Sequence, residues 1–214
     1  VRSNNGTSHS SSHLTLAGTQ VELEDIISYF DACAARWDKN LVRNEEAIAS
    51  ILDHASIRPG ISVLDVACGT GVLFPDYLAR DVASVVAIDV SVEMVKIASS
   101  KNSDPRISVV CGDIMAAEIG RNFDCIMVYN AFPHFPDPAG LLARLSSLLA
   151  SGGRLTIAHG MSRERLNAHH SGSAKPVSIG LMSEIELSKL ASNWLDVDVA
   201  VSDDALYVVS GSRG

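Results

Sequence analysis

The sequence predicts a doubly wound α/β domain that is built on a largely parallel β-sheet. Short apolar runs rich in β-branched residues alternate with segments of helical periodicity through the middle of the chain. Each run leaves a turn and leads toward a helix, which is the order that right-handed crossovers require. Their nearly continuous apolar character is typical of strands covered on both faces. The runs are ISVLDV, VASVVAIDV, RISVVCGD, FDCIMVYN and GGRLTIAHG.

Two helices are predicted ahead of the first strand. Apolar residues recur at helical spacing from about Val21 to Ala35, and the same spacing returns from Asn44 to His54. The pattern changes to strand-like runs only after Pro59-Gly60. The sheet therefore follows an N-terminal helical segment.

The C-terminal end departs from the alternation of strands and helices. After a helix predicted at about Ser183 to Ser192, the runs WLDVDVAV and ALYVVSG are separated only by Ser202-Asp203-Asp204. So short a connection cannot contain a crossover helix. The last two strands are therefore predicted to form an antiparallel hairpin.

Four parts of the chain are distinguished on this basis. Residues 1–19, which begin with a stretch rich in Ser, Asn, Gly and His, are interpreted as a flexible tail, and residues 20–58 as a helical cap. Residues 59–214 form the main domain. Within it, residues 161–182 show no clear element and are interpreted as a loop insertion, which is typical of a lid or a functional loop.

The composition is that of a globular protein with an acidic balance. The chain has 214 residues, of which 47% are hydrophobic, and a net charge of −8. An acidic chain argues against nucleic acid or an anionic membrane as the main partner. No apolar stretch approaches the roughly twenty residues of a membrane helix. The four cysteines are widely spaced, which predicts reduced core thiols in a cytoplasmic protein; they are Cys33, Cys68, Cys111 and Cys125.

The segment VLDVACGTGVLF, residues 63–74, joins a predicted strand to a glycine-rich turn. Gly69 and Gly71 allow the backbone to approach a ligand closely at the carboxyl edge of the sheet. Asp89 ends the next strand, 18 residues after Gly71. A carboxylate at this position suits hydrogen bonds from ribose hydroxyls.

Two residues in this segment separate the candidate nucleotide ligands. A dinucleotide fingerprint has a third glycine where this chain has Phe74. Asp65, just before the turn, would repel a pyrophosphate and attract a cationic group. The ligand predicted is an adenosine that carries a cationic amino-acid end, and NAD is the less favoured alternative.

The chain resembles the class I S-adenosylmethionine-dependent methyltransferases over residues 61–160. VLDVACGTG is similar to their first motif, with Ala67 where many members have glycine, and AIDVSVEMVKIA and VVCGDIM are similar to the second and third. FDCIMVYNAFPHF and LLASGGRLTIAHG resemble the segments of the fourth and fifth strands. The resemblance implies a Rossmann-like seven-stranded sheet, mostly parallel, with a C-terminal hairpin.

The resemblance also implies a cofactor, S-adenosyl-L-methionine, and residues that bind it. Asp89 would bind the ribose, Val90 and Met94 would flank the adenine, Asp113 would face the adenine amino group and Ile114 would lie beside the ring. The full set implied is Asp65, Ala67, Gly69, Gly71, Asp89, Val90, Met94, Asp113, Ile114 and Asn130. The alternative for the strand-end aspartates is a structural role as caps of the following helices.

Histidine is the residue type best suited to take a proton from the methyl acceptor. His134, after the fourth predicted strand, and His159, at the end of the fifth, are the candidate catalytic residues. The alternative is that either one is a buried or capping histidine.

Further residues are candidates for contact with the acceptor. YFDACAARWD, residues 29–38, resembles the segment that folds over the cofactor in small-molecule methyltransferases, although its aromatic residues could equally pack on the sheet. SRERLNAHH, residues 162–170, resembles a segment that follows the fifth strand in a subgroup of bacterial methyltransferases. The acceptor-side candidates are Tyr29, Trp37, Arg163, His169 and His170. No metal is predicted, because no pair such as HxxxH provides adjacent ligands. The alternative is a metal site at which several histidines meet Asp137 or Glu164 in space.

The function favoured by these observations is methyl transfer from S-adenosylmethionine to an O, N, S or C atom of a small molecule by direct displacement. The first alternative is a catalytically silent domain that binds the same cofactor or acts as a scaffold. The second is an NAD-dependent oxidoreductase, which Asp65 and Phe74 disfavour. The partner expected is the small-molecule acceptor, with neither nucleic acid nor membrane, and a homodimer is compatible with the sequence.

Overall fold

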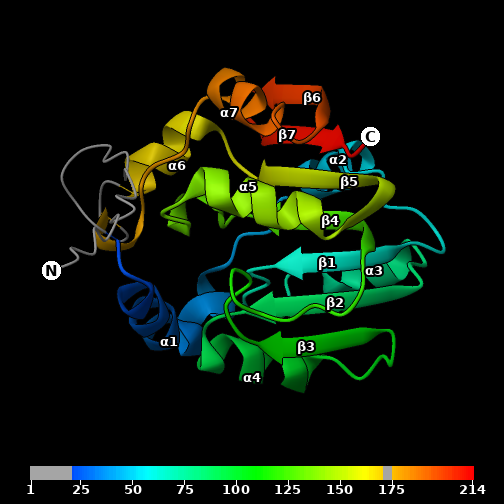
Figure 1. Ribbon diagram of the computed structural model, residues 1–214. Helices are drawn as coiled ribbons and strands as arrows, with labels where there is room; N and C mark the ends of the chain where they lie inside the picture. Colours follow the sequence, from blue (N-terminus) through cyan, green and yellow to red (C-terminus); the bar gives the residue numbers. More distant parts are fainter. Residues whose placement is uncertain (1–20, 171–174) are drawn as a thin grey trace, which may run out of the picture.

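The structure, a computed structural model, describes residues 21–170 and 175–214, so the tail predicted at residues 1–19 lies outside it. A seven-stranded sheet has the order β3-β2-β1-β4-β5-β7-β6 (Figure 1). Strands β1 to β5 pair in parallel, whereas β7 is antiparallel to both β5 and β6. The doubly wound sheet and its C-terminal hairpin are therefore confirmed. The strands are β1 Ser62–Val66, β2 Ser84–Asp89, β3 Ile107–Cys111, β4 Phe123–Tyr129, β5 Leu149–His159, β6 Asp196–Ser202 and β7 Tyr207–Ser212.

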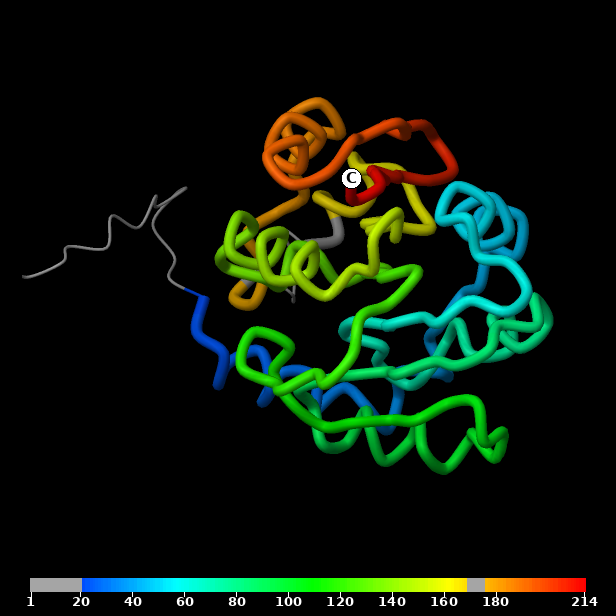
Figure 2. Tube along the Cα trace, turned by 45° about the vertical axis from the view of Figure 1, so that its right-hand side comes forward, coloured from blue at the N-terminus to red at the C-terminus, as the bar shows by residue number. Residues whose placement is uncertain are grey.

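Helices cover both faces of the sheet because neighbouring strand residues point to opposite sides. Val63 packs in one core with residues of α2 and α3, and Leu64 packs in the other with residues of α5 and α7. Figure 2 shows these layers from a second direction, with α1 running beside α4. The α-helices are α1 Leu23–Asn40, α2 Glu45–His54, α3 Phe74–Ala79, α4 Val92–Lys101, α5 Pro138–Ser147, α6 Arg163–His170 and α7 Glu184–Ala191. Two short 3-10 turns are η1 Phe132–His134 and η2 Lys175–Val177.

The segment 161–182 differs from the loop that the sequence predicts, because it contains α6 and η2. The hydroxyl of Ser162 accepts a hydrogen bond from the Arg165 N–H (3.3 Å), as a helix cap does. Leu166 is the one apolar residue of this helix that joins a core. A helix with a single buried apolar residue has no apolar stripe, which is why periodicity does not predict it. The domain boundary placed at residue 59 stays a prediction.

The cysteines only partly match the prediction of core thiols. Cys68 and Cys125 are buried, but Cys111 is exposed on the edge strand β3 and Cys33 is half-buried on α1. Edge strands and amphipathic helices each keep one side toward solvent, so apolar neighbours in sequence did not guarantee burial. Within the described residues, no helix has the length and apolar character needed to cross a membrane.

Candidate functional site

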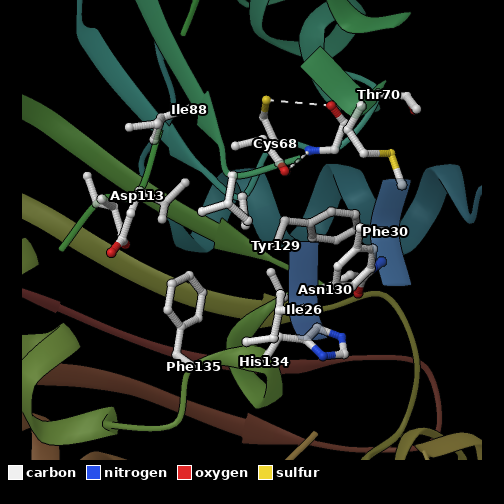
Figure 3. A pocket seen from close by; sticks show the side chains of 18 of the residues that line it. Ile26, Phe30, Cys68, Thr70, Ile88, Asp113, Tyr129, Asn130, His134 and Phe135 are labelled. Atoms are coloured by element: carbon white, nitrogen blue, oxygen red, sulfur yellow. Dashed lines mark hydrogen bonds between the residues drawn. The ribbon is translucent and has the colours of Figure 1, made fainter. Parts of the chain in front are cut away.

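A pocket lies at the carboxyl ends of β1, β2 and β4, with α1 on its outer side. Strand order reverses between β1 and β4, and open α/β sheets bind ligands at such a switch point. Figure 3 shows Phe30, Asn130 and His134 on one side of the pocket and Ile88 and Asp113 on the other. The lining residues are Leu23, Ile26, Phe30, Trp37, Leu41, Val66, Ala67, Cys68, Gly69, Thr70, Val72, Ile88, Asp89, Val90, Met94, Gly112, Asp113, Ile114, Met115, Tyr129, Asn130, Ala131, His134, Phe135 and Pro136.

Asp89 holds the glycine turn in place. Its Oδ2 accepts a hydrogen bond from the Gly69 N–H (2.8 Å), and its Oδ1 accepts one from the Ser91 N–H (2.9 Å). Burial raises the pKa of the Asp89 carboxyl, and these backbone N–H groups oppose that rise. A carboxylate has capacity for further hydrogen bonds beyond these two. Asp89 can therefore shape the turn and still accept hydrogen bonds from a ligand.

The turn itself uses left-handed backbone at three positions. Ala67 and Gly69 both have φ of 55°, and Gly71 has φ of 79°. A side chain at Gly69 would meet no atom within 4 Å, so this glycine borders open space in the pocket. At Gly71 an added Cβ would collide with the ring of Phe74. Gly71 does not line the pocket. Its lack of a side chain lets the Phe74 ring pack against the turn.

Asp65 is buried below the pocket and is absent from its lining. Burial raises the pKa of its carboxyl to about 8, and the charge of Asp89 acts in the same direction. A carboxyl in this state is mostly protonated at neutral pH. A cation placed nearby would favour the ionised form, which gives this group a way to respond to a charged ligand.

An apolar slot lies beyond the turn, between β2, α4 and the segment after β3. Ile88, Val90, Met94 and Ile114 line it, all from the cofactor motifs or next to them. Asp113 lies at the end of this slot, and its Oδ1 accepts a hydrogen bond from the Met115 N–H (2.9 Å). The slot therefore combines apolar walls with one carboxylate, as a purine ring with an amino group requires.

Helix α1 closes the outer side of the pocket and is fastened at two points. The Thr70 hydroxyl donates to Asp38 (2.5 Å), and the Ser91 hydroxyl donates to Asp31 (2.5 Å). Asp38 also pairs with Lys101 of α4 (2.8 Å). Both fastening points are on segments that carry the glycine turn or follow Asp89. The position of α1 is thus tied to the geometry of the turn.

His134 is the candidate catalytic histidine that lines the pocket. Its Nδ1 lies 2.6 Å from the carbonyl oxygen of Val177, and its ring meets Phe30 edge-on with centroids 4.9 Å apart. Burial lowers the pKa of His134, and the hydrogen bond with the Val177 carbonyl opposes this change. The imidazole is therefore mostly neutral at pH 7, as a general base must be.

His159, the other candidate, is fully buried and does not line the pocket. Its ring packs edge-on against Tyr207, with centroids 5.9 Å apart. His159 lies at the carboxyl end of β5, as expected. Tyr207, against which it packs, belongs to the core that also contains residues of α6 and α7. The structure therefore brings His134 but not His159 together with the cofactor motifs.

The acceptor-side candidates separate in the same way. Trp37 lines the pocket, whereas Tyr29 packs edge-on against Phe30 (5.3 Å) and Arg163 donates to the Leu181 carbonyl (3.0 Å), both away from the lining. His169 and His170 end α6, and their side chains lie outside the described part. Eight of the ten predicted cofactor residues line the pocket, since Asp65 and Gly71 do not; the eight are Ala67, Gly69, Asp89, Val90, Met94, Asp113, Ile114 and Asn130.

Several pocket residues are not predicted from the sequence. Ile26, Phe30 and Leu41 line the pocket from α1 or its end, beside the predicted Trp37. Ile26 and Phe30 are four residues apart, as are Trp37 and Leu41, and this helical spacing was the signal that could have found them. Cys68 also lines the pocket, but burial raises the pKa of its thiol well above the usual range, so it is a poor nucleophile. The described residues contain no cluster of three or more His, Cys, Asp or Glu suited to a metal.

The sequence around this pocket is similar to that of known methyltransferases. Residues 63–153 match the family model described as a methyltransferase domain. A ubiquinone biosynthesis O-methyltransferase of Xanthomonas campestris pv. campestris (strain B100) is 39% identical over 113 residues, which are 49% of this chain and 46% of that protein. A counterpart from Xylella fastidiosa (strain 9a5c) is 38% identical over 115 residues, 50% of this chain and 46% of its own length. The chain thus spans about half the length of the curated relatives that it matches.

Solved structures share the fold at low sequence identity. The DhpI-SAM-HEP complex has a TM-score of 0.67 and 23% identity, over 91% of this chain and 99% of that chain. Magnesium protoporphyrin IX methyltransferase from Synechocystis PCC 6803, with bound SAH, has a TM-score of 0.66 and 17% identity, over 90% and 100% of the two chains. These likenesses extend the similarity from residues 63–153 to the whole sheet.

Proposed function

We propose that this protein is a class I S-adenosylmethionine-dependent methyltransferase, because residues 63–153 match the methyltransferase domain model and the sheet shares its fold with solved methyltransferase structures. The protein transfers a methyl group from S-adenosylmethionine to a hydroxyl oxygen of a small, uncharged acceptor. The observation that carries the proposal is that one pocket is lined both by the cofactor motifs and by the neutral imidazole of His134. The O-methyltransferase relatives support oxygen as the acceptor atom.

The residues around the pocket fit S-adenosylmethionine. Open space beside Gly69 leaves room for a ligand against the backbone, and Asp89 retains capacity to accept ribose hydroxyls. The apolar slot of Val90, Met94 and Ile114 suits the adenine. When bound, S-adenosylmethionine supplies an electrophilic methyl group on a cationic sulfur. Acidic residues near the turn are complementary to that charge.

His134 and the walls of the pocket perform the protein's part of the reaction. His134 takes the proton that the acceptor hydroxyl loses, while Phe30 and Trp37 exclude water from the outer side. The charged residues in the lining are Asp89 and Asp113, and no lysine or arginine of the described chain joins them. An anionic acceptor would therefore be repelled rather than neutralised, which favours an uncharged one.

The experiment that tests the proposal combines binding and turnover. We expect calorimetry to detect binding of S-adenosylmethionine but not of NAD, and mass spectrometry to detect O-methylated product from a panel of neutral phenols. Thiols, amines and carboxylate-bearing phenols serve as matched acceptors in the same panel. Binding of NAD alone would contradict the proposal. Cofactor binding without methylation of any acceptor would favour the catalytically silent alternative.

A further inference from the structure

His134 is held by a segment distant in sequence. Its Nδ1 lies 2.6 Å from the carbonyl oxygen of Val177, which is 43 residues away. A carbonyl oxygen can only accept a hydrogen bond, so Nδ1 carries the hydrogen in this contact. In a neutral imidazole the other ring nitrogen, Nε2, is then the unprotonated one. The Val177 carbonyl therefore selects one tautomer of His134.

The turn that carries this carbonyl is anchored by two kinds of contact. The Ile179 N–H donates to the Pro133 carbonyl (2.9 Å), which ties the segment after η2 to η1 next to His134. The Val177 side chain is 2% exposed and belongs to a small core with Val21 and Ile26. These contacts hold the Val177 carbonyl beside His134, and the hydrogen bond that the carbonyl accepts adds to them.

Helix α1 completes the frame around the imidazole. Ile26 of α1 packs in the small core with Val177, and Phe30 packs against it and meets the His134 ring edge-on at 4.9 Å. Because α1 is also fastened to Thr70 and Ser91, the frame extends to the glycine turn and the end of β2. One helix thus borders the cofactor motifs and the histidine together.

We infer that Val177 is a positioning residue, whose carbonyl oxygen, held against α1, fixes His134 in the tautomer that presents Nε2 as the base. This inference rests on the proposed function, in which His134 takes the acceptor's proton. As the acceptor oxygen bonds to the methyl carbon, the bond from that carbon to sulfur breaks, its electron pair stays on the sulfur, and S-adenosylhomocysteine is the leaving group. The hydroxyl proton moves to the Nε2 lone pair of His134 and then passes from Nε2 to solvent. Val177 contributes to this step through its backbone carbonyl and its packing.

Nuclear magnetic resonance of the histidine rings tests the inference without any turnover. Long-range ¹H–¹⁵N correlations distinguish the two neutral tautomers, and the signals of His134 are assigned by comparison with His134→Asn. We expect the Nδ1–H tautomer in the wild-type protein and a mixture of tautomers in Val177→Gly, whose turn loses its packing. Ile179→Ala is the matched control, because this side chain is 37% exposed while its backbone N–H still binds Pro133. An Nε2–H tautomer in the wild type, or an unchanged spectrum in Val177→Gly, would overturn the inference.

A pair of variants at His134 provides a second test, which does not require that Val177→Gly folds. In His134→Asn the side-chain amide can donate from the place of Nδ1, whereas in His134→Gln it lies nearer the place of Nε2. We expect hydrogen exchange of the Ile179 amide to stay near the wild-type rate in His134→Asn and to rise at least about tenfold in His134→Gln. Equal exchange in the two variants would contradict a role for the Val177 contact.

Kinetics then separate this inference from the proposed function. We expect Val177→Gly to lower kcat at least about tenfold while the Kd for S-adenosylmethionine changes less than about threefold. If the wild-type protein methylates its acceptor and Val177→Gly retains full kcat, the positioning role is wrong and the proposed function stands. If no acceptor is methylated but the wild type shows the Nδ1–H tautomer, the proposed function fails while the contact with Val177 is confirmed.

Discussion

The N–H of Gly69 donates a hydrogen bond to Oδ2 of Asp89 over 2.8 Å, so the glycine turn after β1 and the carboxylate at the end of β2 form one unit. This contact explains how a short glycine-rich sequence and an acid 20 residues later act together. The turn takes its shape from the carboxylate, and the carboxylate is held toward the pocket by the turn. A substitution at Gly69 or at Asp89 is therefore expected to disturb the position of the other residue.

We expect Asp89→Ala to weaken binding of S-adenosylmethionine by about 1 to 3 kcal/mol, because ribose hydrogen bonds and the Gly69 contact are both lost. Isothermal titration calorimetry measures this loss. Asp81→Asn is the matched control, since the Asp81 side chain is 80% exposed and lies before β2, at the other end of that strand. Equal affinities of Asp89→Ala and the wild type would show that the motif is aligned incorrectly.

Binding of S-adenosylmethionine at pH 7 is expected to release protons from Asp65. Its pKa of about 8 in the free protein leaves the carboxyl mostly protonated, and a nearby cation favours ionisation. Calorimetry in two buffers with different protonation enthalpies gives the number of protons released. The release should decline toward pH 9, where Asp65 is already ionised, and should be absent in Asp65→Asn. A proton count at pH 7 equal to that of Asp65→Asn would contradict this role.

The stability of the free protein should fall as pH rises from 5 to 8. The folded pKa of Asp65, about 8, lies above the value of about 3.9 in an unfolded chain, so the folded state binds more protons in this range. Stabilisation by the protonated carboxyl is complete below the unfolded pKa and is lost as pH rises through the folded one. Relative to Asp65→Asn, the wild type should lose at least about 1.4 kcal/mol of unfolding free energy, the equivalent of one pKa unit. Urea denaturation of both proteins at pH 5 and pH 8 measures the difference, and parallel curves would argue against it.

Loosening of α1 is expected to weaken cofactor binding. Asp38→Ala removes the hydrogen bond from Thr70 and the ion pair with Lys101. We expect a loss of about 1 kcal/mol in binding of S-adenosylmethionine, seen by stopped-flow fluorescence mainly as faster dissociation. Glu24→Ala, an exposed acid on the same helix, is the control and should match the wild type. Unchanged dissociation in Asp38→Ala would mean that the Asp31–Ser91 hydrogen bond and the apolar face hold α1 without Asp38.

The two candidate histidines should give different results on substitution. His159→Ala empties a fully buried position and is expected to lower the free energy of unfolding by about 2 to 4 kcal/mol. His134→Asn should leave that free energy within about 1 kcal/mol and lower kcat by at least about 100-fold, through loss of the base. Denaturation and steady-state kinetics on both variants decide between them. A larger effect on kcat from His159→Ala would return the catalytic assignment to His159.

Most of the sheet could be predicted because its strands are locally distinctive. Runs such as those of β1 and β4 are mostly apolar, which follows from burial on both faces, and the short connection before β7 permits only a hairpin. Helix α6 could not be predicted in this way. It is made mainly of polar residues, and its position depends on Leu166 reaching a core built by other segments.

The sequence predicts a pocket residue correctly where its position at the end of a strand is enough to bring its side chain to the pocket. Asp89 is the last residue of β2 and Asp113 is the second residue after β3, and both line the pocket, whereas Asp65 lies within β1 and is buried outside the lining. Phe30 is a pocket residue whose role could not be predicted from the sequence. Its contact with His134 joins segments that no motif connects, and only the three-dimensional packing of α1 reveals it.

Ala67 and Asn130 both have left-handed backbone, with φ of 55°. This conformation shapes the pocket and lowers the stability of the folded chain. The two residues follow the neighbouring strands β1 and β4 and line the same pocket. Asparagine tolerates this conformation, but alanine in it costs on the order of 1 kcal/mol. The margin that keeps the domain folded therefore has to come from the two cores beside the sheet. Substitutions at Ala67 that relieve this cost would stabilise the domain and alter the pocket at the same time.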